Sequence, residues 1–246
     1  MSDVSSMAAA APSGDNVLAR LVGVIFSPRA TFERIVARPR WFGALAIVVG
    51  VIALGQFALL STESGQQAMV DQQVRSAEQW GGTVTDQQYA QFEQWAPYGR
   101  YFALAGVLIV APLVAFIIAG ALLGVFNALL GGNASYKQVL AVHTHSGATS
   151  LLGLLFTLPL NYLRESMSSP TNLGVFAQAF LDDTNFVARF LGTIDLFIIW
   201  WVLVNAIGLA VLYKRRTAPI FWSLMGVYIA IALIYVSVTR IMSGGA

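Results

Sequence analysis

Seven polar or ionisable residues lie inside apolar segments of this sequence, and they are the residues whose types and positions could do chemistry. His143 and His145, two residues apart, occupy one such segment, and the others occupy four more: Gln56, Asn127, Asp195, Asn205 and Arg240. Burying such side chains in hydrocarbon is costly, so they are the first candidates for function. The chemistries they suggest are a path for a proton or small polar solute, and a metal site built on the His-x-His pair.

The composition indicates the medium that surrounds these residues. Of 246 residues, 57% are hydrophobic and only 11% are charged, whereas a soluble domain has about 25% charged residues. The sequence therefore predicts a membrane protein. It contains no cysteine, which excludes disulfides and Cys-built metal sites. Its two lysines lie in separate short segments, so no broad basic patch suggests nucleic acid.

The apolar segments predict an all-α, polytopic membrane protein. A membrane helix needs about 20 mostly apolar residues, and five segments qualify: 41–60, 101–130, 139–160, 190–212 and 218–240. Residues 1–15 have no apolar core and are predicted to be a disordered tail, and residues 16–242 to form a single membrane domain. The glutamine-rich outer loop 61–100 is expected to be a helical hairpin, because Thr85 and Gln88 have capping-box spacing. A second outer loop, 161–189, contains a short amphipathic stretch at 175–181.

Basic residues near the ends of membrane helices predict the orientation. Nine of the fourteen Lys and Arg residues fall on the side of the N-terminus, and five fall on the other side. The positive-inside rule then places the N-terminus in the cytoplasm and, with five spans, the C-terminus outside a cell membrane.

The segment before the first span has the pattern of an anchor in the membrane surface. Apolar stripes at residues 18–25 and 32–36 predict two short amphipathic helices lying in the cytoplasmic interface. Pro39 should end the second helix, Arg34, Arg38 and Arg40 should stay among the headgroups, and Trp41 should lie in the aromatic belt.

The depths of the intramembrane residues predict two polar layers. At 1.5 Å per residue, His143 lies about 6 Å from the cytoplasmic boundary, and the two asparagines are near that level. Asp195 lies about 8 Å from the outer boundary, with Gln56 and Arg240 at similar depth. No ionisable residue joins the layers, and a metal site at the inner level would lack a third ligand. We therefore interpret these residues as structural hydrogen-bonding groups, with Asp195 paired to Arg240.

Three stretches together resemble the Yip (Ypt-interacting protein) domain family of five-span membrane proteins. They are SPRATFERIVARPRWFGAL before the first span, GGNASYKQVLAVHTHSG at the third, and IDLFIIWWVLVNAIGLAVLYKRRT at the fourth and the basic turn after it. The resemblance implies a five-helix bundle, a cytoplasmic N-terminus and no enzyme activity or cofactor. Eukaryotic relatives are associated with small GTPases and membrane shaping, but this sequence is more similar to the bacterial branch.

The resemblance has limits that bear on partners. His143 and His145 stand where the family pattern has a small or aromatic residue and then a proline, and the N-terminal region is short. Binding of a small GTPase is therefore not carried over. The expected partners are the bilayer and other membrane proteins or a second copy, so the predicted function is that of a non-catalytic scaffold. The alternative is a transporter or channel component, which would need a water-accessible cavity joining Asp195 to His143.

Overall fold

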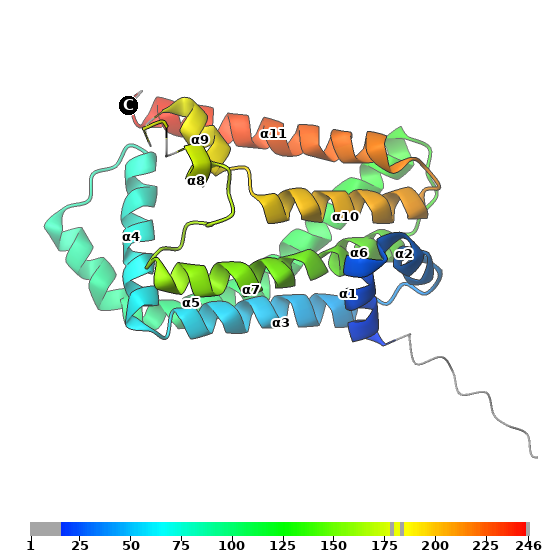
Figure 1. Ribbon diagram of the computed structural model, residues 1–246, viewed down its shortest axis with the longest axis horizontal. Helices are drawn as coiled ribbons and strands as arrows, with labels where there is room; N and C mark the ends of the chain where they lie inside the picture. The colour runs from blue at the N-terminus through cyan, green and yellow to red at the C-terminus, as the bar shows by residue number, and fades with distance from the viewer. Residues whose placement is uncertain (1–15, 178–179, 183–184, 245–246) are drawn as a thin grey trace, which may run out of the picture.

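A computed structural model describes residues 16–177, 180–182 and 185–244 of the chain, and every regular element in these ranges is a helix. Figure 1 shows most of the helices running side by side along one long axis. The predicted all-α architecture is therefore confirmed. The tail predicted at 1–15 lies outside the described residues.

Four stretches of helix are long and apolar enough to cross a membrane. They are α3 (Phe42–Leu59), α5 (Asp86–Leu123) with the π-helical turn η1 (Gly124–Leu129), α6 (Tyr136–Ser146) with α7 (Ala148–Leu163), and α11 (Thr217–Met242). The remaining predicted span, 190–212, corresponds to α10 (Leu196–Leu212), which has only 17 residues. At 1.5 Å per residue α10 is about 26 Å long, slightly less than the ~30 Å hydrocarbon core of a bilayer.

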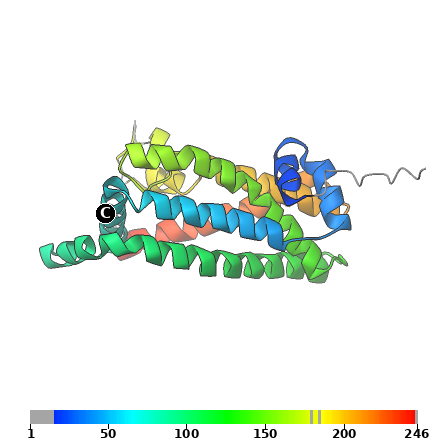
Figure 2. The same cartoon turned by 90° about the horizontal axis from the view of Figure 1, so that it is seen from below.

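The outer loop 61–100 is helical, but it is not a separate hairpin. Its first half is α4 (Glu63–Gln79), and Thr85 and Gln88 form the predicted capping box. The helix that begins there is α5, which continues for 38 residues through the second span with Pro97 and Pro112 in its interior. Figure 2 shows the first turns of this helix projecting beyond the end of the bundle. The helix therefore begins 15 residues before residue 101, where the span was predicted to start, and it continues through Pro97 without a break.

The fourth span begins later than predicted. Residues 186–192 form a separate short helix, α9 (Phe186–Gly192), and α10 starts only after Asp195, whose carboxylate caps it. A short helix, α8 (Gly174–Ala177), precedes α9 and covers the start of the predicted amphipathic stretch, of which residues 178–179 lie outside the described part.

The two predicted N-terminal helices are present, as α1 (Val17–Phe26) and α2 (Pro28–Ala37). The apolar face of α2 does not meet lipid, which corrects the interfacial interpretation. Phe32 and Ile35 are fully buried and belong to the same core cluster as Val142 of α6. Gly208 of α10 allows this approach, because a Cβ there would lie 2.5 Å from Val142 and 3.0 Å from Phe32. α2 is therefore part of the bundle core.

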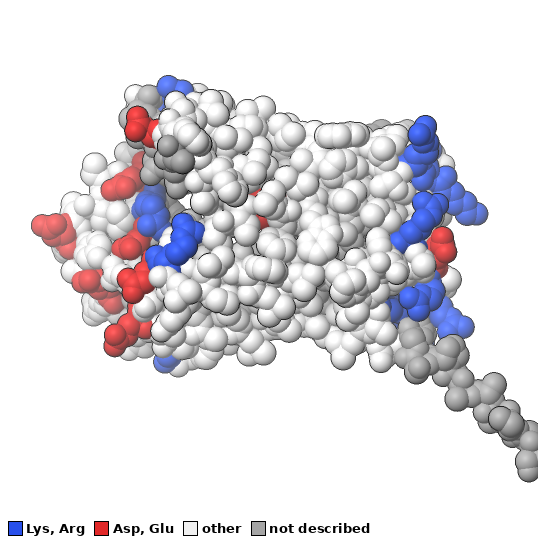
Figure 3. Space-filling view, viewed as in Figure 1, with Lys and Arg blue, Asp and Glu red and all other residues white. Residues whose placement is uncertain are grey.

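On the face that Figure 3 shows, charged side chains gather at the two ends of the bundle and leave its middle almost free of charge. The end that carries α1 and α2 is mostly basic, and we call it the basic end; the end that carries α4 has most of the acidic residues. Between the two ends, the surface has the composition of a membrane-facing belt.

Candidate functional site

A lateral groove of about 1490 Å³ opens on the side of the bundle. Its walls are α5 with η1 on one side and α11 on the other, and α10 forms its floor together with His143 of α6. Ordinary small-molecule pockets have volumes of roughly 300–1,000 Å³. The lateral groove is therefore large enough for an extended guest, and most residues along its length are apolar.

A buried polar group interrupts the apolar floor of the lateral groove. His143 and Asn205 both line it, and their side chains are only 7% and 2% exposed. The Asn205 amide donates to the carbonyl of Trp201 at 3.1 Å, and the Trp201 ring meets the His143 ring edge-on with centroids 5.4 Å apart. Nδ1 of His143 and Oδ1 of Asn205 make no well-formed hydrogen bond, although the two side chains lie close enough to interact with each other. An unpaired buried polar atom costs about 1–3 kcal/mol, so a guest that bonds here would recover that energy.

Four cationic side chains and one carboxylate line the mouth of the lateral groove at the basic end. Lys214, Arg215 and Arg216 come from the turn between α10 and α11, and Arg29 with Glu33 comes from α2. Arg29 and Glu33 pair weakly with each other, at 3.9 Å and with exposed side chains. The turn itself holds the three consecutive cations at the mouth, where they are exposed to solvent.

The turn that carries these cations has an unusual backbone. The N–H of Arg215 bonds the carbonyl of Ala210 at 2.9 Å, which closes the end of α10, and this places Lys214 at φ +52°. Glycine usually occupies this left-handed position after a helix, because other residues pay a steric cost. A lysine here is a departure from the local optimum, and such departures are concentrated at functional sites.

Asp195 is a helix cap with four donors, and its predicted pairing with Arg240 is wrong. The carboxylate accepts from the N–H groups of Phe197 and Ile198, from the Thr171 hydroxyl at 2.6 Å and from the Ser169 hydroxyl. Arg240 is exposed on α11, with its guanidinium 5.9 Å from the ring centroid of Phe186. Local hydroxyl groups satisfy the carboxylate, so it does not need a cation.

Tyr228 connects the cap of α10 to the lateral groove. Its hydroxyl donates to the carbonyl of Thr193 at 2.5 Å and accepts from the N–H of Asp195 at 3.3 Å. Tyr228 lines the groove, whereas Asp195 is not among the lining residues. The cavity joining Asp195 to His143 that a transport path would need is therefore not formed by the described residues.

The other predicted polar residues take separate positions. Asn127 donates to the carbonyl of Ala134 at 2.8 Å and accepts from the Tyr213 hydroxyl at 3.0 Å. Burial raises the pKa of the Tyr213 phenol, which keeps it a neutral donor. His145 is fully buried, with Nδ1 2.8 Å from the carbonyl of Ala141, and is not among the groove-lining residues. Gln56 is half-buried on α3. The structure thus brings only His143 and Asn205 to one site.

The predicted interfacial anchor is in part a set of protein contacts. α2 ends at Ala37, just before Pro39, as predicted. The carbonyl of Arg38 accepts from buried Arg20 of α1 at 3.0 Å, and Arg34 donates to Thr31 at 3.3 Å. Trp41 meets Phe116 of α5 edge-on, with ring centroids 5.6 Å apart.

Arg40 lies between α2 and α3, next to Trp41.

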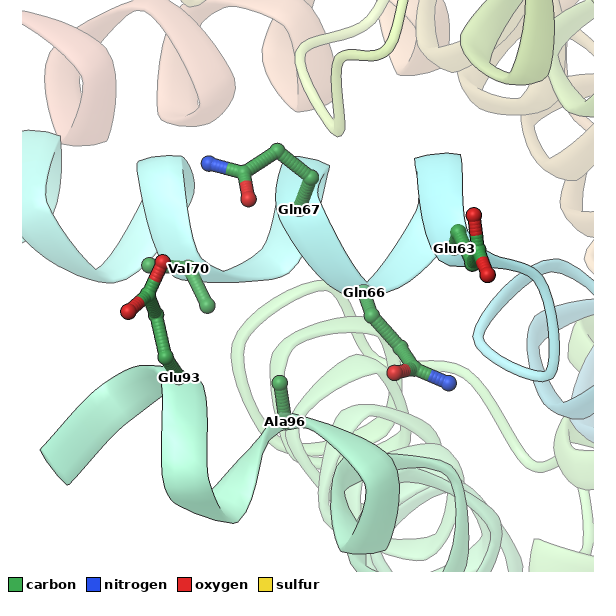
Figure 4. Close-up of a pocket in the computed structure, with 6 residues that line it drawn as sticks. All are labelled: Glu63, Gln66, Gln67, Val70, Glu93 and Ala96. Atoms are coloured by element: carbon green, nitrogen blue, oxygen red, sulfur yellow. The ribbon is translucent and has the colours of Figure 1, made fainter. Parts of the chain in front are cut away.

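A second pocket, of about 170 Å³, lies at the opposite end between α4 and the start of α5. Figure 4 shows that its two carboxylates, Glu63 and Glu93, lie apart and do not converge on a common point. No group of three or more His, Asp or Glu side chains that could hold a metal ion occurs in the part of the chain that was searched, namely the described residues. This pocket therefore offers no arrangement for catalysis or metal binding.

Sequence reasoning identified His143 and Asn205 but missed the rest of the site. Trp201 was not singled out, although it lies four residues before Asn205 and so on the same face of one helix. Lys214, Arg215 and Arg216 were used only to predict orientation. Nothing local indicates that α5 and α11 form opposite walls, because they are far apart in the sequence.

Two comparisons find related proteins. The family model of the Yip1 domain matches residues 22–239. A curated relative, membrane protein YknW of Bacillus subtilis (strain 168), is 31% identical over 197 residues, which cover 77% of this chain and 76% of the relative. No solved structure gives a significant match.

Proposed function

The chain belongs to the Yip1 domain family, and from this premise we propose that it is a non-catalytic multi-pass membrane protein that binds a guest through the lateral groove. The guest is a lipid or an apolar segment of another membrane protein, and the bundle acts as its scaffold. Neither the family description nor the relative's name refers to catalysis.

The observation that carries this proposal is the position of the lateral groove. It is bounded by helices α5, α10 and α11, so it lies at the depth of the predicted hydrocarbon core and not in a water-facing loop. Val227 of α11 and Ala121 of α5 line it and are exposed on the membrane-facing surface. A guest can therefore enter sideways from the bilayer.

We also propose that the chain crosses the membrane five times, with the basic end in the cytoplasm. α10 would make the fourth of the five crossings despite its length, because the exposed cations after it can reach the headgroups. The positive-inside rule gives the orientation, since the basic residues gather at the end of α1 and α2.

The transport alternative has less support. It requires a polar path from His143 to Asp195, but the groove-lining residues between them, Trp201, Val202 and Ile198, are apolar or aromatic. Tyr228 lies at the far end, with its hydroxyl engaged by the backbone of residues 193 and 195. A proton or ion would therefore meet hydrocarbon where a path should continue.

Cysteine labelling inside the membrane tests the proposed function, because the natural sequence has no cysteine. A cysteine at Ala121, in the lateral groove, should react slowly with a membrane-soluble maleimide when a guest is bound, and quickly after detergent delipidation. The matched control is a cysteine at Ala105, which is exposed on the same helix but outside the groove. Equal rates at both positions before and after delipidation would contradict a guest in the groove.

A further inference from the structure

We infer that the guest of the lateral groove is an anionic phospholipid from the leaflet at the basic end, with its headgroup held by the cations of the α10–α11 turn. This inference rests on the proposed function and names the ligand of the same site. Three features of the groove support it: its length, the charge at its mouth and the unpaired polar atoms on its floor.

The length and depth of the groove fit an acyl chain. Along α11 the lining runs from Pro219 to Ile231, which is about 18 Å at 1.5 Å per residue. Half of a bilayer's hydrocarbon core is about 15 Å thick. A chain entering from the basic end can therefore lie in the groove over the full depth of its own leaflet. A compact polar solute would leave most of this apolar surface unfilled.

The charge at the mouth selects an anionic headgroup. Lys214, Arg215, Arg216 and Arg29 oppose one carboxylate, that of Glu33, so the mouth carries a formal net charge of +3. One N–H of Arg215 donates to the carbonyl of Leu130 at 2.7 Å, which positions the guanidinium and leaves its remaining donors for a phosphate.

The start of α11 adds to this positive charge. α11 begins at Thr217 and has no side-chain cap, so the positive end of its helix dipole lies at the same mouth.

The floor offers an unsatisfied hydrogen-bonding site below the mouth. Asn205 lies seven residues before the end of α10, about 10 Å along the helix from the turn. Nδ1 of His143 and Oδ1 of Asn205, which make no well-formed hydrogen bond, are more than nine-tenths buried and belong to side chains that line the groove. A phospholipid has ester carbonyls below its phosphate, and these can accept from an Nδ1–H of His143, whereas a purely hydrocarbon guest cannot.

Lipid binding by the full-length protein in a neutral detergent tests the inference, because no charged membrane surface is present there. Native mass spectrometry would compare the affinity for phosphatidylglycerol with that for phosphatidylcholine of the same chains. The wild type should prefer phosphatidylglycerol by at least tenfold. The double variant Lys214→Gln/Arg216→Gln should lose affinity for phosphatidylglycerol by up to about fivefold per charge, because an exposed ion pair is worth up to roughly 1 kcal/mol. Its affinity for phosphatidylcholine should fall much less, because the choline cation offsets the charge of the phosphate in that lipid.

Two further variants separate the possible failures. Lys137→Gln removes an exposed charge at the basic end outside the groove, and it should leave the preference for phosphatidylglycerol intact. Ala121→Trp fills the groove and should lower the affinity for both lipids, whereas Ala105→Trp should not. If the wild type binds both headgroups equally and Ala121→Trp weakens both, the inference fails and the proposed function stands. If Ala121→Trp changes the binding of no guest, whether lipid or co-purifying membrane protein, both fail.

Discussion

Removing the carboxylate of Asp195 should destabilise the fold, whereas removing the guanidinium of Arg240 should not. Asp195 is only 9% exposed, and it caps α10 while accepting from the hydroxyl groups of Ser169 and Thr171. Loss of a helix cap costs about 1 kcal/mol. A hydrogen bond to an ionised group contributes about 1.5–3 kcal/mol. The two hydroxyl oxygens lie 3.0 Å apart and can pair with each other once the carboxylate is gone. The loss of their hydrogen bonds to Asp195 should therefore cost an energy near the lower end of that range.

We therefore expect Asp195→Ala to cost about 3 kcal/mol, which corresponds to a fall in Tm of about 6–12 °C for a chain of this size. Asp195→Asn keeps the cap and should cost about a third as much, because asparagine is also a good N-cap. Arg240→Ala loses only an exposed cation–π contact with Phe186, which amounts to 1 kcal/mol or less.

Thermal unfolding in detergent, followed by tryptophan fluorescence, measures these differences. The losses of the single variants should add in the double variant to within about 0.5 kcal/mol, because the two side chains share no partner. An ion pair would give another pattern. Arg240→Ala would then lose as much as Asp195→Ala, and the double variant would lose less than the sum. That result would refute the assignment of Asp195 as a cap held by hydroxyl groups.

Three more predictions follow from the geometry. Lys214→Gly should raise the free energy of unfolding by about 1 kcal/mol in thermal melts, because glycine relieves the strain of the left-handed backbone. The same variant should bind phosphatidylglycerol more weakly in native mass spectrometry. A lower Tm would contradict the assignment of strain to Lys214. Gly208→Ala should cost about 1–3 kcal/mol through overpacking, while Gly226→Ala, with open space around it, should cost nothing in the same melts. A cysteine at exposed Glu78 should react with an impermeant thiol reagent in intact cells, whereas a cysteine at exposed Lys137 should react only after permeabilisation. The reverse pattern would overturn the proposed orientation.

The features that the sequence predicts well depend on a few neighbouring residues. Pro39 follows the end of α2 and Thr85 caps α5, and both were expected from how these residue types act at helix ends. The start of the fourth span was predicted wrongly because no single neighbouring residue type marks it. Phe190 and Leu191 continue the apolar run, so hydropathy does not reveal that the chain leaves the helix at Thr193 and restarts after Asp195.

The role of the α2 stripe could not be decided from its pattern. An apolar face looks the same in sequence whether it meets lipid or protein. Only the structure shows that Phe32 reaches Val142 across Gly208. The exposed apolar residues of the N-terminal region are instead on α1, where Leu18 and Phe26 are 60% and 81% exposed.

The two ends of α10 give the lateral groove its difference in polarity. α10 lines the groove from Ile198 to Val211, between α11 and the last turns of α5 with η1. Asp195 ends the floor on one side with a cap that Tyr228 ties to α11, and Lys214 ends it on the other with a turn that exposes three cations. One end is thus held by hydrogen bonds within the protein, and the other presents positive charge to the headgroups. A lipid can use a groove with this asymmetry, whereas a transported ion would need polar groups along its whole length.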